Sequence, residues 1–133
     1  MLNLSELLEA NPNGVLTTRD GESLKARVFQ YLFTEGNRVF FCTSKEKDVY
    51  KQLTANANVS FCSYPDNFSP VVSISGQAVF VDGLDIKTRI LKENPMINGI
   101  YKSPDNPVFA VFYINVEEAK TFSFADGPNT YKL

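Results

Sequence analysis

The sequence predicts a mainly β fold with short α-helices, in which a six-stranded antiparallel β-barrel has helices over its ends. Two observations lead to this fold class. Six apolar segments of strand length follow one another at the spacing of hairpins, with turn-forming residues between them. Strands and helices do not alternate, which argues against the parallel sheet of a Rossmann fold.

The N-terminal half begins with a short helix and continues as hairpins. Leucines recur at helical spacing in residues 3–10, where Asn3 or Ser5 would cap the helix. Strands are expected at residues 15–18, 24–33 and 38–43, with turns at 19–21 and 35–37. A second helix is expected at residues 45–54, with Ser44 as its N-cap.

The C-terminal half has the longest strands. They are expected at residues 59–64, 71–81 and 108–116, and the last continues through 120–124 after a bend at Glu117 and Glu118. Gly76 in the middle of a strand indicates a bulge or a close approach of backbone. A helix should begin at Asp82 or Asp85 and stop at Asn94–Pro95, with one further helical turn at 96–101.

Two strands are apolar on both faces. In residues 38–43, Val39 and Phe41 lie on one face, while Phe40 and Cys42 lie on the other. The strand at 108–116 has the same character. A small barrel cannot hide this much apolar surface, so the sequence predicts a homodimer.

Composition and charge exclude several classes of function. The 133 residues predict one domain, 1–133, and the net charge of -2 argues against nucleic acid as a partner. With no histidine and two cysteines, the chain lacks the ligands for a zinc site and the residues for a Ser-His-Asp unit. The N-terminus has no signal-peptide pattern and no apolar run could span a membrane, so a cytoplasmic protein is expected.

The helix expected at 45–54 points to a phosphate. Lys45 and Lys47 would lie in its first turn, where the helix dipole disfavours cations unless an anion is nearby, and Lys51 follows one turn after Lys47. The alternative is a solvated face on which Glu46 and Asp48 screen the lysines.

Arg27 is expected to join these lysines. If the strands at 24–33 and 38–43 form a hairpin, the start of the first lies beside Thr43 and Ser44 at the end of the second. One arginine, two hydroxyls, the lysines and a helix end would then converge on one anion.

Several segments carry a family resemblance. They are Gly14–Thr18 before an Asp-Gly turn, Arg27 at a strand start, Val39–Ser44, Lys51–Leu53, Asn56–Phe61 and Ser73–Ala78. In order and spacing, they resemble the pyridoxamine 5′-phosphate oxidase-like split barrels that bind FMN. The shorter relatives, called general-stress or nitroimidazole-resistance proteins, are the more similar branch.

The resemblance implies FMN at a homodimer interface. Arg27 and the lysine-bearing helix would hold the phosphate, and residues near Phe41 would line the flavin ring. The implied cofactor-binding set is Arg27, Val28, Phe29, Gln30, Cys42, Thr43, Ser44, Lys47 and Lys51. Where the family often has Ser and then Lys, this chain has Lys47 and Val49, so the phosphate role falls to Lys47 or Lys51.

The resemblance leaves the reaction open and assigns no catalytic residue. The oxidases proper carry an Arg/His segment near the C-terminus, and here no Arg follows Arg89. We therefore expect an FMN-dependent oxidoreductase acting on a small molecule, but not a pyridoxamine phosphate oxidase. The alternatives are a flavin carrier or sensor without turnover, and a split barrel that binds a different ligand.

Overall fold

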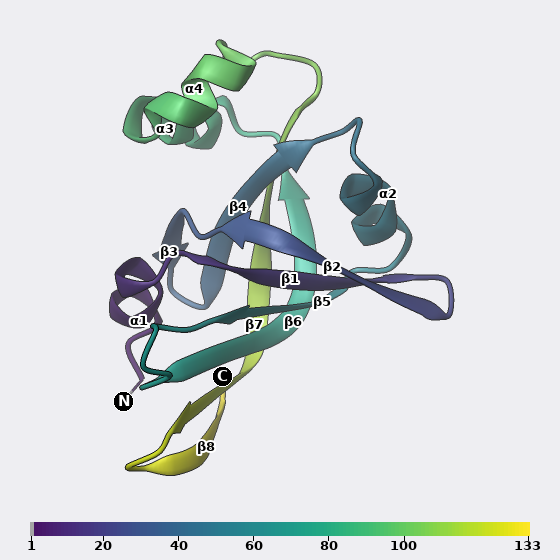
Figure 1. Cartoon of the computed structure of the whole chain (residues 1–133). Helices are drawn as coiled ribbons and strands as arrows, with labels where there is room; N and C mark the ends of the chain where they lie inside the picture. The colour runs from purple at the N-terminus through teal and green to yellow at the C-terminus, as the bar shows by residue number, and fades with distance from the viewer. Residues whose placement is uncertain (1) are drawn as a thin grey trace.

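Antiparallel strands form a strongly curved sheet in the computed structural model, which describes residues 2–133 (Figure 1). The eight strands are β1 (Asn13–Asp20), β2 (Ser23–Gln30), β3 (Phe33–Glu35), β4 (Arg38–Ser44), β5 (Asn58–Ser63), β6 (Val71–Val81), β7 (Phe109–Ser123) and β8 (Gly127–Lys132). The helices are α1 (Leu4–Ala10), α2 (Asp48–Ala55), α3 (Leu84–Glu93) and α4 (Pro95–Tyr101).

The sheet confirms the mainly β, antiparallel fold class of a split barrel. Its strand order is β2-β1-β5-β6-β7-β4-β3, with β8 paired to β7, so the sheet is not closed. The six expected strands are present, and the short strands β3 and β8 are additional. None of the helices in residues 2–133 is long and apolar enough to cross a membrane.

The main core lies inside the curved sheet, beneath α1 and α2. Asn3 caps α1, because its Oδ1 accepts a hydrogen bond from the backbone N–H of Glu6 at 3.1 Å. Leu8 of α1 and Val49 and Leu53 of α2 are buried. They complete a cluster that the inward residues of the strands fill, and these elements thereby share one apolar core.

A second apolar cluster explains why β4 and β7 are apolar on both faces. Phe40 on β4 and Phe109 on β7 face away from the main core, and Ile90 and Leu91 of α3 cover them. Figure 1 shows α3 and α4 at one end of the molecule, beyond the ends of β4 and β6. The apolar surface attributed to a dimer interface is therefore covered by helices of the same chain.

Gly76 lies where two strands approach closely. The pairing of β6 with β7 shifts at Ser75 and Gly76, which leaves Glu117 as the extra residue of a bulge. A Cβ atom at Gly76 would clash with the carbonyl oxygen of Asn115. The expected bend at Glu117 and the close backbone approach at Gly76 are both confirmed.

The expected hairpin between residues 24–33 and 38–43 is wrong. β2 pairs with β1, whereas β4 pairs with β3 and β7. The expected strand ends early, at Gln30, because the Tyr31 N–H donates to the carbonyl of Pro12 and the Leu32 N–H donates to that of Phe40. Between these two hydrogen bonds the chain passes from β2, at one edge of the sheet, to β3, at the other edge.

The lysine-bearing helix also begins later than expected. α2 starts at Asp48 with Lys47 as its N-cap, because residues 44–47 form a turn in which the Lys47 N–H donates to the Ser44 carbonyl at 3.0 Å. Ser44 is not the cap; its Oγ accepts from the Glu46 N–H. The first turn of α2 therefore carries an acid and neither Lys45 nor Lys47.

Candidate functional site

The open sheet leaves a seam between two strand edges. β2 pairs only with β1, and β3 covers β4 only from Arg38 to Phe40. The other edge of β2 and the edge of β4 beyond Phe40 therefore have no partner strand within the described sheet. Unpaired N–H and C=O groups of such edges are free to bind a polar ligand.

A pocket of about 270 Å³ lies in this seam, and we call it the seam pocket. It collects six residues of the predicted cofactor-binding set. Its lining consists of Val28, Phe29 and Gln30 from β2, Leu32 between β2 and β3, Cys42 and Thr43 from β4, Lys47 before α2, and Ile97, Ile100 and Tyr101 from α4. The seam pocket thus has a strand edge on two sides and a helix on a third.

Thr43 supplies a hydroxyl that lacks a partner. The residue is only 3% exposed, and its Oγ1 is the one buried side-chain polar atom in residues 2–133 without a hydrogen bond. Leaving a buried hydroxyl unpaired costs about 1–3 kcal/mol. Because Thr43 lines the seam pocket, this hydroxyl without a protein partner is a candidate contact for a polar cofactor.

Lys47 is the only charged side chain among the residues that line the seam pocket. It is the N-cap of α2, where no side chain caps the N–H groups of the first turn and the Tyr50 N–H donates to the Lys47 carbonyl at 3.2 Å. An ammonium beside free N–H groups suits a phosphate, although Asp48 follows at once. The residues present therefore fit a flavin with a phosphate, through one cation and one hydroxyl.

Arg27 directly precedes Val28, which lines the seam pocket, but the Arg27 side chain points into the barrel. Its Nη1 donates to the Leu16 carbonyl at 3.2 Å and to Thr18 Oγ1 at 2.9 Å. Its Nη2 donates to Gln52 Oε1 of α2 at 2.7 Å. Partial burial lowers the pKa of Arg27, and the nearby carboxylate of Asp48 opposes this shift. All three hydrogen-bond acceptors are neutral, so the guanidinium joins β1 and β2 to α2.

Two other predicted residues lie outside the seam pocket. Ser44 is buried at the end of β4, on the opposite face from Thr43, and serves the turn before α2. Lys51 lines a separate open depression between α2 and the β1–β2 turn, together with Arg19 and Asp48. The structure brings together six of the nine predicted residues and leaves Arg27, Ser44 and Lys51 around them.

Local sequence patterns do not identify Ile97 and Ile100 of α4 as residues of a pocket. Ile97, Ile100 and Tyr101 lie far along the chain from β2, and only the packing of α3 and α4 on β4 and β7 brings them there. Tyr101 stacks on Phe109 with 4.5 Å between the ring centres. An aromatic at helical spacing is commonly a core residue, and Tyr101 is indeed buried while it also lines the pocket.

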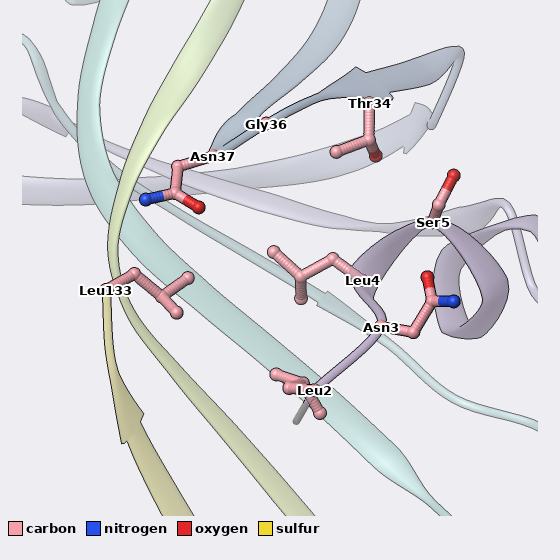
Figure 2. Close-up of a pocket in the computed structure, with 8 residues that line it drawn as sticks. All are labelled: Leu2, Asn3, Leu4, Ser5, Thr34, Gly36, Asn37 and Leu133. Atoms are coloured by element: carbon pink, nitrogen blue, oxygen red, sulfur yellow. The ribbon is translucent and has the colours of Figure 1, made fainter.

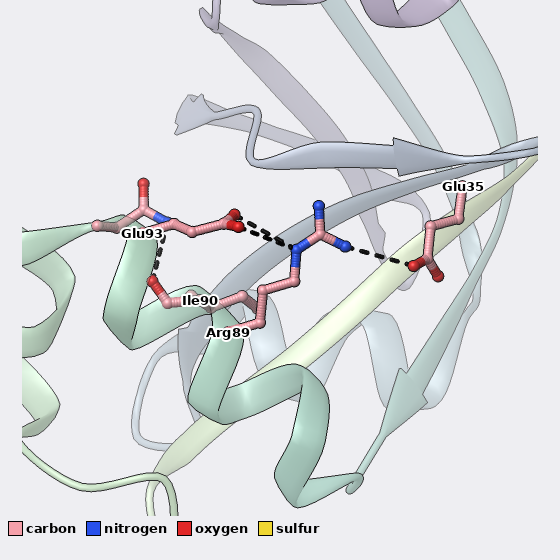
Figure 3. A network of polar contacts seen from close by, with 5 residues as sticks. Glu35, Arg89, Ile90 and Glu93 are labelled. Atoms are coloured by element: carbon pink, nitrogen blue, oxygen red, sulfur yellow. Dashed lines mark hydrogen bonds and ion pairs between the residues drawn. The ribbon is translucent and has the colours of Figure 1, made fainter.

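Arg89 anchors α3, and through it α4, to the edge of the sheet (Figure 3). Its guanidinium lies 3.8 Å from the centre of the Phe33 ring on β3. Its Nη1 is 3.4 Å from a carboxylate oxygen of Glu35, and its Nε is 3.3 Å from one of Glu93. This network holds the helices that form one wall of the seam pocket.

Cys42 and Tyr101 face each other across the wall of the seam pocket. Burial raises the pKa of the Cys42 thiol to about 12, and Lys47 opposes this shift. Burial, with a contribution from Cys42, also raises the pKa of Tyr101 to about 12. Both groups stay protonated at neutral pH, and neither can act as a general base there.

A larger pocket of about 440 Å³ lies elsewhere, between α1, the β3–β4 turn and the end of the chain (Figure 2). Leu2, Leu4 and Leu133 supply its apolar surface. None of its lining residues is charged. It offers no cation to a phosphate, and among residues 2–133 no cluster of His, Cys, Asp or Glu could hold a metal ion.

A comparison with protein families identifies the chain. The family model described as pyridoxamine 5′-phosphate oxidase matches residues 3–123. The chain belongs to the pyridoxamine 5′-phosphate oxidase family. Members of this family generally bind a flavin and are typically dimers. A comparison with curated proteins finds no match.

Solved structures of this family share the fold. A NimC/NimA family protein from Clostridium acetobutylicum is 23% identical, with a TM-score of 0.86 over 96% of this chain and 88% of that one. General stress protein 26 from Bacillus anthracis is 16% identical, with a TM-score of 0.82 over 96% and 94%. A general stress protein 26-related protein from Clostridium acetobutylicum is 14% identical, with a TM-score of 0.80 over 96% and 90%.

Proposed function

We propose that this chain binds FMN in the seam pocket and is an oxidoreductase that acts on a small molecule. The observation that carries the proposal is the composition of this pocket. It joins six residues of the predicted cofactor set to two unpaired strand edges and to the unpartnered hydroxyl of Thr43. Family membership supports a flavin as the ligand.

The size and exposure of the pocket support a site shared by two copies of the chain. Ligand pockets usually enclose about 300–1,000 Å³, and the seam pocket falls just below this range. Two of its apolar residues, Val28 and Ile100, are 72% and 69% exposed. A second copy docked over this opening would cover both side chains and complete the cavity.

The residues of the chain would orient the flavin and keep water from it. The free edges of β2 and β4 offer backbone donors and acceptors to the polar edge of a flavin ring, and Phe29 and Ile97 offer apolar contacts. Lys47 and Thr43 would hold the phosphate. When bound, the flavin supplies the electron-transfer chemistry.

A flavin carrier or sensor without turnover is the second candidate. Cys42 and Tyr101, the titratable lining residues besides Lys47, stay protonated at neutral pH. Neither of these two groups can act as a general base there, a role that a binding protein does not need. Bleaching of the bound flavin by NADH or NADPH would favour the enzyme, and a flavin unaffected by either would favour the carrier.

The visible spectrum of the purified protein tests flavin binding directly. We expect flavin absorbance after purification or after addition of FMN. Lys47→Ala should weaken FMN binding about tenfold, which is the scale of one charge-assisted hydrogen bond. Lys92→Ala on the exposed side of α3 is the matched control and should leave FMN binding unchanged. A colourless protein that takes up no FMN would contradict the proposal.

A further inference from the structure

The open depression between α2 and the β1–β2 turn shares no lining residue with the seam pocket, and we call it the hairpin depression. It encloses about 450 Å³, within the range of about 300–1,000 Å³ that is usual for small-molecule sites. Figure 1 shows α2 and the β1–β2 turn on the same side of the molecule. The wall includes Arg19 and Asp20 from β1 and Asp48, Lys51 and Gln52 from α2.

The carboxamide of Gln52 has a fixed orientation. The residue is only 9% exposed, and its Oε1 accepts hydrogen bonds from the Thr18 hydroxyl and from Arg27 Nη2, each at 2.7 Å. A guanidinium can only donate, so the carboxamide atom that faces it must be the oxygen. Gln52 Nε2 therefore points away from Arg27, toward the hairpin depression that Gln52 lines.

Gln52 Nε2 has no hydrogen-bond acceptor within residues 2–133. In that range Thr43 Oγ1 is the one fully covered side-chain polar atom without a partner, so Gln52 Nε2 must reach the open space. A donor that a buried side chain holds at the wall of a depression calls for an acceptor inside it. Lys51, the neighbouring residue on α2, and Arg19 are further donors of this wall. Such donors suit a carboxylate, whose oxygens only accept.

The hairpin depression also has two acids. Asp48 lies one turn before Gln52 on the same face of α2, and Asp20 is the last residue of β1. The ion pairs found in residues 2–133 involve neither of these acids, and neither Arg19 nor Lys51. A simple anion or a simple cation gains little from this balanced wall, whereas a molecule that carries both charges can place each beside its opposite.

We propose that the hairpin depression binds a small zwitterion of the free α-amino acid class. Gln52 Nε2, together with Lys51 and Arg19, binds the carboxylate. Asp48 and Asp20 bind the ammonium. The contacts are noncovalent and use no residue of the seam pocket, so this inference does not depend on the proposed flavin function.

Titration of the isotope-labelled full-length protein with each of the common L-amino acids in turn, followed by nuclear magnetic resonance, tests the inference. We expect at least one of them to shift the side-chain amide signal of Gln52 at concentrations up to about 10 mM, where a ligand with a dissociation constant of about 1 mM is nearly saturating. The N-acetyl derivative of that amino acid lacks the ammonium, and its carboxamide lacks the carboxylate. Each should bind at least about tenfold more weakly, because each loses one charged contact.

Gln52→Glu removes the donor that the inference depends on. A glutamate keeps the size of the side chain and an oxygen for Arg27 and Thr18, but it has an acceptor in place of Nε2. Binding of the amino acid, followed by the backbone amide signals of α2, should weaken at least about tenfold. Thermal unfolding of the same preparation shows that the fold is kept.

A second pair of variants tests the charge beside this donor. Lys51→Gln on the exposed side of α2 should weaken binding of the amino acid about threefold, which is the scale of an exposed ion pair. Lys92→Gln makes the same change of charge on the exposed side of α3, away from the hairpin depression, and should leave binding unchanged.

The outcomes decide the inference either way. Binding of an amino acid that needs both of its charges and the Gln52 donor supports it. A titration without shifts for every amino acid, equal binding of either derivative, or unchanged binding in Gln52→Glu would overturn it. If Gln52→Glu fails to fold, unchanged binding in Lys51→Gln overturns it instead. Each result holds whether or not the protein takes up FMN.

Discussion

Thr43 is buried in the wall of the seam pocket with an unpaired hydroxyl, which makes its substitution informative. Thr43→Val keeps the shape of the side chain and removes the hydroxyl. We expect the free energy of unfolding to stay constant or rise by about 1 kcal/mol, because an unsatisfied buried group disappears. FMN binding should weaken about fivefold or more if the hydroxyl contacts the cofactor.

Chemical denaturation and FMN titration of the same preparations measure both effects. Thr121→Val on β7 is a suitable control, since this half-exposed threonine lies away from the seam pocket and should not alter flavin binding. A loss of stability in Thr43→Val, with unchanged flavin affinity, would show that the hydroxyl serves the fold and not a ligand.

The raised pKa values of Cys42 and Tyr101 predict that the folded protein loses stability at alkaline pH. Folding raises their pKa values from 9.0 and 10.0 to about 12 each. Their neutral forms are thus favoured in the folded state, and this contribution is fully present below pH 9. It is lost as the pH rises from about 9 to 12, because the unfolded chain releases these protons first.

The free energy of unfolding at pH 8 and at pH 10.5 checks this prediction. Cys42→Ala should make the decrease smaller, and Cys62→Ala on β5, whose thiol pKa is also raised by burial, is the comparison variant. Equal pH dependence in both cysteine variants would contradict the assignment to Cys42.

At the scale of residues, six of the nine residues that the resemblance implies line the seam pocket, but the pairing of their strands was not predicted correctly. Val28, Phe29 and Gln30 are named with Cys42 by the family resemblance, whereas local patterns predict only the strands that carry them. The mistaken step was the pairing of β2 with β4, which depends on contacts between distant parts of the chain. Arg27 was consequently expected at an anion site, whereas its hydrogen bonds lie inside the barrel.

Among the elements, α3 and α4 depend on a few links to the sheet. Arg89 bonds Glu35 and stacks on Phe33, and these two residues belong to the edge strand β3. Arg89→Ala should lower the free energy of unfolding by about 1 kcal/mol. Exposed ion pairs contribute little, so most of this loss should come from the stacking and should persist in high salt.

Urea unfolding at low and high salt measures this loss. Glu93→Gln removes only the ion pair within α3, which is half-exposed, and should have little effect. A loss in Arg89→Ala that vanishes in high salt would mean that the ion pairs, and not the ring of Phe33, account for the contribution.

The helices illustrate which elements can be predicted from local sequence. The further helical turn expected at 96–101 corresponds to α4, where Pro95 occupies the start, and α1 begins after Asn3, one of the two expected caps. The start of α2 was misplaced because residues 44–47 form a turn fixed partly by the bond from the Lys45 N–H to the carbonyl of Val108. That partner lies on another part of the chain.

For the whole molecule, the exposed side of β2 predicts a dimer that shares the flavin site. Val28 is 72% exposed and lies opposite Val15, which is 38% exposed, in the β1–β2 pairing. Val28→Asp should produce a monomer at concentrations where the unaltered protein is a dimer, because it places a charge in the apolar contact. FMN binding should be lost together with the dimer.

Analytical ultracentrifugation with and without FMN tests this prediction. Leu84→Asp, at the exposed start of α3, introduces the same charge at a distant apolar residue and should leave the dimer intact. A monomeric unaltered protein, or a Val28→Asp variant that stays dimeric and yellow, would contradict the proposed interface.

The open seam also affects how readily the protein aggregates or is degraded in a cell. Two strand edges without partners are places where another chain can add a strand, which is a route to aggregation. A bound ligand covers these edges, and by mass action it also favours the folded state. Cofactor supply would therefore govern how much of the protein survives after synthesis, and the apoprotein would be the form that degradation and aggregation remove first.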